Sequence, residues 1–78
     1  MQIFKTAHKQ LQKLHKNDAI RMINALLHYE KNQKGYIKWL ENRPGYRIKI
    51  DNYHVIFEFQ EEHNEIFVLE LVPMPTNT

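Results

Sequence analysis

The sequence predicts an α+β fold in which an N-terminal helical hairpin packs on a small antiparallel sheet of about four strands, in the order β-α-α-β-β-β. Two observations predict this fold. Residues 46–59 alternate between apolar and polar side chains, as paired strands with one buried face do. Residues 6–32 instead carry apolar side chains at helical spacing. Each apolar side needs a cover, so we expect the helices to pack on the sheet.

The N-terminal part of the chain predicts one short strand and two helices. Met1–Phe4 is apolar enough for a first strand, and Thr6 can cap a helix that runs to about Lys16. Asn17-Asp18 then supplies a new N-cap for a second helix, which should fray near Lys31-Asn32. Because the connection is so short, the two helices should form an antiparallel hairpin.

The segment after the helices is interrupted twice before the paired strands begin. Lys34-Gly35 breaks the helical pattern, and Arg43-Pro44-Gly45 introduces the strands. Between these breaks, we expect four apolar residues to cross the sheet edge or to fill the core: Tyr36, Ile37, Trp39 and Leu40. A last strand from Ile66 to Val72 is stopped by the prolines that follow it.

The paired strands define two chemically different faces. If Asp51-Asn52 forms a two-residue turn, four pairs lie opposite one another: Ile50 and Tyr53, Lys49 and His54, Ile48 and Val55, and Arg47 and Ile56. One face then collects the apolar residues Tyr46, Ile48, Ile50, Tyr53, Val55, Phe57 and Phe59. The other face carries Arg47, Lys49 and His54, which are two permanent cations and one group that titrates near neutral pH.

Charge is strongly divided along the chain. All 11 Lys and Arg residues lie at or before Lys49, where three acidic residues oppose them, which gives 11 − 3 = +8. From Ile50 onward there are six acidic residues and no Lys or Arg. A basic sector of this kind is typical of proteins that bind phosphate backbones. The alternative is a solvated helix surface whose lysines only keep the protein soluble.

Length and composition indicate one domain, residues 1–78, with a hydrophobic content of 42% that suffices for a core. The chain has no cysteine, so it has no disulfide framework or thiolate chemistry. No signal peptide and no membrane span are evident in the sequence, and a cytoplasmic location is therefore expected. No His pair has the spacing that a helical metal site needs, and we expect no metal and no cofactor.

The segment Tyr46-Arg47-Ile48-Lys49-Ile50-Asp51-Asn52-Tyr53-His54-Val55-Ile56-Phe57 resembles the most recognisable stretch of the RelE/ParE superfamily, the toxins of type II toxin–antitoxin pairs. Leu40 and the Lys-rich segment from Thr6 to Leu14 also match the family's pattern. The resemblance covers nearly the whole chain and implies a single RelE/ParE-like toxin domain over residues 1–78, but only the central dozen residues are specific.

The resemblance implies a function and a set of site residues. RelE-type members cleave messenger RNA in the ribosomal A site, with attack of a ribose 2′-hydroxyl on the adjacent phosphate. Arg47 and Lys49 match two basic family positions that bind phosphate, and His54 stands where many members have Arg. His54 is thus our candidate for acid–base catalysis. The chain departs from the family after its last strand, where Leu71 to Thr78 contains neither the usual Arg nor the Tyr.

These observations predict the toxin of a type II toxin–antitoxin pair, acting as a metal-independent, ribosome-dependent mRNA endoribonuclease with an atypical active site. The expected partners are a cognate antitoxin, the ribosome and mRNA, and no membrane. One alternative is a ParE-like inhibitor of DNA gyrase. The other is a catalytically degenerate homologue that binds only its antitoxin, in which Arg47 and Lys49 merely solvate the surface and His54 is a tolerated substitution.

Overall fold

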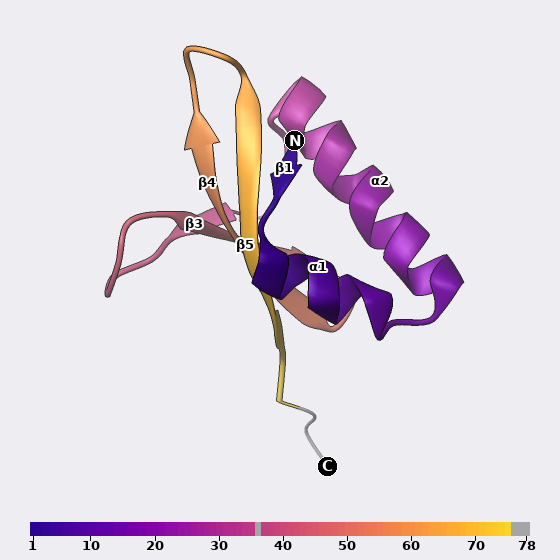
Figure 1. Ribbon diagram of the computed structural model, residues 1–78. Coiled ribbons are helices and arrows are strands. Elements are labelled where there is room, and N and C mark those ends of the chain that lie inside the picture. The colour runs from indigo at the N-terminus through magenta and orange to yellow at the C-terminus, as the bar shows by residue number, and fades with distance from the viewer. Residues whose placement is uncertain (36, 76–78) are drawn as a thin grey trace.

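The computed structural model describes residues 1–35 and 37–75. Two helices and five strands follow one another along the chain: β1 (Gln2–Ile3), α1 (Lys5–Gln12), α2 (Lys16–Asn32), β2 (Ile37–Trp39), β3 (Tyr46–Ile50), β4 (Tyr53–Gln60) and β5 (Glu65–Pro73). Both helices lie on the same side of the sheet (Figure 1). The two-layer α+β fold predicted from the sequence is confirmed.

The sheet has five strands, in the order β1-β5-β4-β3-β2, rather than about four. The additional strand is β2, which pairs antiparallel with β3 and forms one edge. The segment that contains it was expected to cross the sheet edge or to fill the core, and it instead forms the edge strand itself, with Ile37 packed against the core. Trp39, at the end of β2, is 69% exposed and so does not fill the core. The expectation for Tyr36 falls outside the residues that the structure describes. At the other edge, β1 pairs parallel with β5, so the sheet is mostly rather than wholly antiparallel.

The helix boundaries differ from the prediction at both N-termini and at the end of α1, which stops at Gln12 instead of about Lys16. α1 begins at Lys5, so Thr6 lies inside the helix and Phe4 takes the N-cap position without a side-chain hydrogen bond. α2 begins at Lys16 with His15 as its N-cap, so Asn17 and Asp18 are helical rather than capping. In both places a residue without a side-chain cap hydrogen bond takes the N-cap position, although good capping residues follow it. The predicted end of α2 is confirmed at Asn32.

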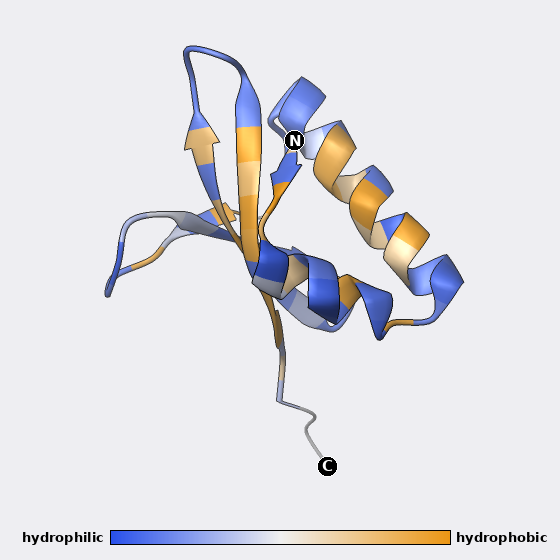
Figure 2. Ribbon diagram, in the orientation of Figure 1, coloured by the Kyte–Doolittle hydropathy of each residue, from blue (hydrophilic) through white to orange (hydrophobic). Residues whose placement is uncertain are grey.

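The core lies between the helices and one face of the sheet. Its largest fully buried side chains come from both layers: Met22, Leu26, Val55, Phe57, Ile66, Val68 and Leu71. Figure 2 shows apolar residues along α2, β4 and β5, with hydrophilic residues at the β4–β5 turn. The observed pairing of β3 with β4 has the predicted register, with Ile48 opposite Val55 and both side chains buried. The apolar alternation therefore identified the correct face of each strand.

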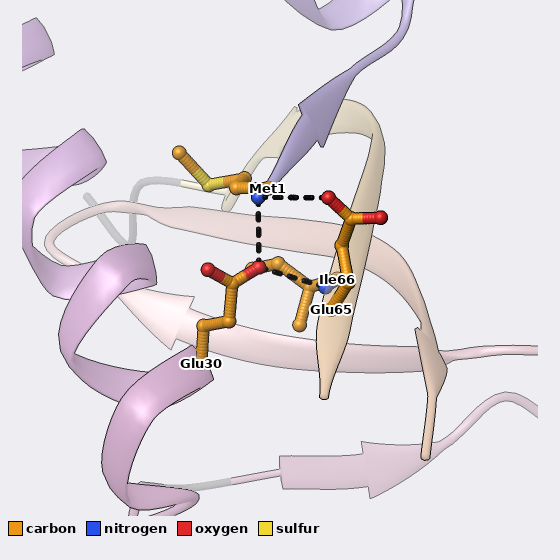
Figure 3. Close-up of polar contacts among 4 residues, drawn as sticks. All are labelled: Met1, Glu30, Glu65 and Ile66. Carbon is orange, nitrogen blue, oxygen red and sulfur yellow. Dashed lines mark hydrogen bonds and ion pairs between the residues drawn. The ribbon is translucent and has the colours of Figure 1, made fainter. Parts of the chain in front are cut away.

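An ionic contact joins the two layers at the N-terminus (Figure 3). The Met1 ammonium group lies 3.0 Å from the Glu30 carboxylate of α2 and 3.3 Å from that of Glu65 at the start of β5. Glu30 also accepts a hydrogen bond of 2.9 Å from the Ile66 backbone N–H. The hydrogen bond with Glu30 raises the pKa of the Met1 amino group above its ordinary value, against the opposing effect of burial.

No helix in the described part of the chain is long and apolar enough to cross a membrane.

Candidate nucleic-acid interface

The face of the sheet that points away from the helices carries most of the polar side chains of the strands. The register of the four antiparallel strands fixes which residues share this outer face: Lys38, Arg47, Lys49, His54, Ile56, Glu58, Phe67, Glu70 and Val72. We call this surface the outer face. Its half nearest β2 is cationic, and its half nearest β5 is largely apolar and acidic.

The predicted site residues lie together on the cationic half. Lys49 and His54 are direct cross-strand partners, and Arg47 is two residues from Lys49 on the same strand. With Ile37 and Lys38 of β2, they line a hollow of about 300 Å³, which we call the first hollow. The structure therefore brings Arg47, Lys49 and His54 to one place. Their chemical roles stay a prediction.

The β3–β4 turn holds these residues in register. Asp51 takes a φ of 52°, in the left-handed region that Asp and Asn tolerate better than most residues. Its carboxylate is 3.3 Å from the guanidinium of Arg21, which ties the turn to α2. The two-residue turn predicted at Asp51-Asn52 is present, and it fixes Lys49 opposite His54.

The first hollow is positively charged and has no internal counterion. Within residues 1–35 and 37–75, no carboxylate forms an ion pair with Lys38, Arg47 or Lys49. The pKa of His54 is lowered from its ordinary value, first by burial and then by the charges of Arg47, Lys49 and Lys38. At neutral pH, His54 is thus a neutral imidazole that can accept a proton, beside three cations that can bind an anion.

Lys38 is a residue of this hollow that the sequence analysis did not single out. It lies opposite Arg47 because β2 pairs with β3. The signal was the pattern Ile37-Lys38-Trp39, in which a lysine stands between two apolar residues as in a half-buried strand. Three residues are too few for that pattern to be read reliably without knowing that a partner strand is adjacent.

A second hollow adjoins the first. It measures about 620 Å³ and lies under the β2–β3 loop, where it is lined by residues 38–43 and by Arg47. The two hollows share Lys38 and Arg47. The loop closes tightly, because the Leu40 N–H donates to the Gly45 carbonyl at 3.0 Å. Gly45 has a φ of 126° and would place a Cβ 3.0 Å from the Phe57 carbonyl oxygen, so the turn requires glycine.

One loop residue crosses the outer face. The Arg43 guanidinium forms an ion pair with the carboxylate of Glu70 on β5. Since the strands run in the order β5-β4-β3-β2, the Arg43 side chain extends from the β2–β3 loop over β4. Glu70 therefore neutralises one cation of this surface, and the cations of the first hollow stay unneutralised.

Residues 1–35 and 37–75 contain no group of three or more His, Asp or Glu side chains placed to hold a metal ion. The chemistry available to the first hollow from these side chains is anion binding and proton transfer.

No protein-family model and no curated protein matches the sequence. Solved structures do match its fold. Archaeal RelE, in its complex with RelB from Pyrococcus horikoshii, is 25% identical with a TM-score of 0.79, over 97% of this chain and 94% of that chain. RelE in the RelB–RelE antitoxin–toxin complex of Methanococcus jannaschii is 20% identical with a TM-score of 0.71, over 94% and 89% of the two chains.

The isolated Escherichia coli RelE toxin is 18% identical, with a TM-score of 0.74 over 97% of this chain and 84% of that chain. The matched proteins are thus RelE toxins from archaea and a bacterium, and this chain has the RelE fold over nearly its whole length. The resemblance drawn from the central segment is confirmed.

Proposed function

We propose that this protein is the toxin of a toxin–antitoxin pair and cleaves mRNA on the ribosome. The observation that carries the proposal is the first hollow, where a neutral histidine lies among three unneutralised cations on the face of a RelE-type sheet. RNA cleavage by internal transesterification needs a proton acceptor next to positive charge, and this hollow contains both.

In the proposed reaction, Arg47, Lys49 and Lys38 bind the scissile phosphate and stabilise the charge of the phosphorane. His54 accepts the proton of the ribose 2′-hydroxyl while the 2′-oxygen attacks phosphorus. The bond from phosphorus to the 5′-oxygen then breaks, and the imidazolium returns the proton to that oxygen. The products are a 2′,3′-cyclic phosphate and a 5′-hydroxyl end, with no metal and no redox step.

The proposed protein partner is a small antitoxin with an acidic segment. Two of the matched RelE structures are complexes with RelB, which supports a partner of this kind. The first 49 residues have a net charge of +8, and a segment of opposite charge would be attracted to that sector at low salt.

Induced expression in cells tests the proposal. New 5′-hydroxyl ends in polysome-bound mRNA, with plasmid supercoiling unchanged, are the expected result. A change in supercoiling without new mRNA ends would instead identify a gyrase inhibitor of the ParE type. Neither effect, together with unimpaired growth, would identify a homologue that binds only its antitoxin.

A further inference from the structure

The Arg43–Glu70 ion pair places a guanidinium on the same surface as the candidate catalytic residues. Glu70 pairs with Ile56 across β4–β5, and Ile56 pairs with Arg47 across β3–β4. Adjacent strands lie about 4.8 Å apart, so the backbones at Glu70 and Arg47 are separated by about 10 Å. The Arg43 head group therefore lies beyond the first hollow, on the same side of the sheet.

Burial of Ile56 supports this placement. Ile56 faces away from the helices and does not belong to the core cluster, yet it is only 5% exposed. Something on the outer face must cover it. The Arg43 guanidinium contacts Glu70, the direct cross-strand partner of Ile56, and arginine stems commonly cover apolar surface of this kind while the charged head stays in water.

The second hollow adjoins the first and shares two lining residues with it. Lys38 and Arg47 line both, and Arg43 lines the second together with one carboxylate, that of Glu41. An RNA strand whose phosphate occupies the first hollow would continue over this adjoining space. The next anionic group would then meet the β2–β3 loop, whose one cationic residue, Arg43, is held by Glu70.

We propose that Arg43 is a further phosphate-binding residue, which Glu70 holds in the free protein and exchanges for a neighbouring RNA phosphate when substrate binds. This inference rests on the proposed function, because it takes single-stranded RNA as the ligand. Arginine suits the exchange, since its planar fork fits carboxylate and phosphate equally well. The Arg43 and Glu70 side chains are 49% and 34% exposed, and an exposed ion pair contributes little. Breaking it therefore lowers the affinity for RNA by about fivefold at most.

The test is binding rather than cleavage. The probe is a short, fluorescently labelled 2′-O-methyl oligonucleotide, which lacks the nucleophile and cannot be cut. Arg43→Ala should weaken binding about tenfold, the loss expected for one charge-assisted hydrogen bond. It should also reduce the slope of log affinity against log salt by about 0.7, the value for one phosphate contact on a single strand. Glu70→Gln should tighten binding by about two- to fivefold.

Lys9→Ala is the matched control. Lys9 is an exposed cation on α1, which packs on the other side of the sheet, and it lines neither hollow. The Lys9→Ala variant loses the same charge as Arg43→Ala and should leave binding nearly unchanged. The effect of Glu70→Gln on RNA binding should be smaller in an Arg43→Ala background. Without Arg43, Glu70 holds no side chain that RNA could bind, so removing its charge releases nothing.

An equal, small effect of Arg43→Ala and Lys9→Ala would overturn the inference, and the ion pair with Glu70 would then only hold the β2–β3 loop in place. Inorganic phosphate distinguishes the two hollows, because its binding should depend on Arg47 and not on Arg43. Loss of phosphate binding in Arg43→Ala would overturn the assignment to a second phosphate.

If wild-type protein does not bind the oligonucleotide, this inference and the proposed function both fail. If Arg43 contributes to binding and the wild type does not cut mRNA, only the proposed function fails.

Discussion

Lys49 and His54 are direct partners across the β3–β4 hairpin, so an ammonium group and an imidazole face the same side of the sheet from neighbouring strands. Directly opposed side chains have their Cβ atoms about 5 Å apart. Burial is the main cause that lowers the pKa of the His54 imidazole, and the charges of Arg47, Lys49 and Lys38 lower it further. The pairing thus places a permanent charge on one strand and a group that can exchange a proton on the next.

The first prediction concerns His54. His54→Ala should lower the rate of mRNA cleavage by about 10²–10⁴, the usual contribution of a general acid or base. Ribosome binding should change little, because His54 is neutral and the cations stay in place. Single-turnover cleavage on programmed ribosomes measures the rate, and a pelleting assay measures binding. A loss below tenfold would remove His54 from the mechanism.

The lowered pKa of His54 also predicts how folding stability depends on pH. The unfolded chain binds a proton near the ordinary value of 6.5, whereas the folded protein binds it only at lower pH. The contribution of His54 to stability is therefore fully present above pH 6.5. It declines as the pH falls from 6.5 towards the lower pKa of His54 in the folded protein. Urea unfolding at about pH 7.5 and about pH 5.5 measures this decline, which should be smaller in His54→Gln than in the wild type. An equal decline would show that His54 is not responsible.

Arg47 and Lys49 should act on binding instead of proton transfer. Arg47→Ala and Lys49→Ala should each weaken RNA binding and reduce its salt dependence, because each removes one phosphate contact. Lys34→Ala is a matched control, since Lys34 is exposed and lies outside both hollows. Fluorescence anisotropy across a salt series provides both quantities. Unchanged salt slopes in both variants would show that these cations only solvate the surface.

The sequence predicted the strand pairing well because the physics there is local and repeated. Ile48 and Val55 lie on opposite sides of a short turn, and a shift of one residue would have exposed both of them. The helix starts were predicted less well. Thr6 and Asp18 are good capping residues, but caps contribute only about 1 kcal/mol each, and burial of a side chain such as Leu11 or Met22 is worth more.

The site was predicted only where its residues are close in sequence. Arg47, Lys49 and His54 belong to one hairpin, so alternation alone put them on one face. Lys38 and Arg43 reach the same surface through an edge strand and a loop. Their positions depend on the pairing of β2 with β3 and on a contact between residues 27 positions apart. No pattern within the sequence encodes such a contact.

The contact of Glu30 with the N-terminus should contribute to stability. Glu30→Ala removes the carboxylate that pairs with the Met1 ammonium group and accepts the Ile66 N–H. The Ile66 N–H would then lose its acceptor, and because Ile66 is fully buried, water would not readily replace it. We therefore expect the free energy of unfolding to fall by about 1–3 kcal/mol. Glu62→Ala, in the exposed β4–β5 turn, removes the same charge and serves as the control in urea unfolding. Similar losses in both variants would show that the contact contributes little.

The last prediction concerns the protein partner. Expressed from its own locus, the protein should copurify with a small acidic antitoxin, and the affinity of the pair should fall as salt rises. The reason is the separation of charge, since attraction between the +8 sector and an acidic segment is screened within about 10 Å at moderate ionic strength. Isothermal titration at low and high salt measures the effect. A tight complex with salt-independent affinity would mean that apolar contacts dominate the interface. A lone monomer that is not toxic on expression would favour the catalytically degenerate homologue. An active toxin without an antitoxin would impair growth.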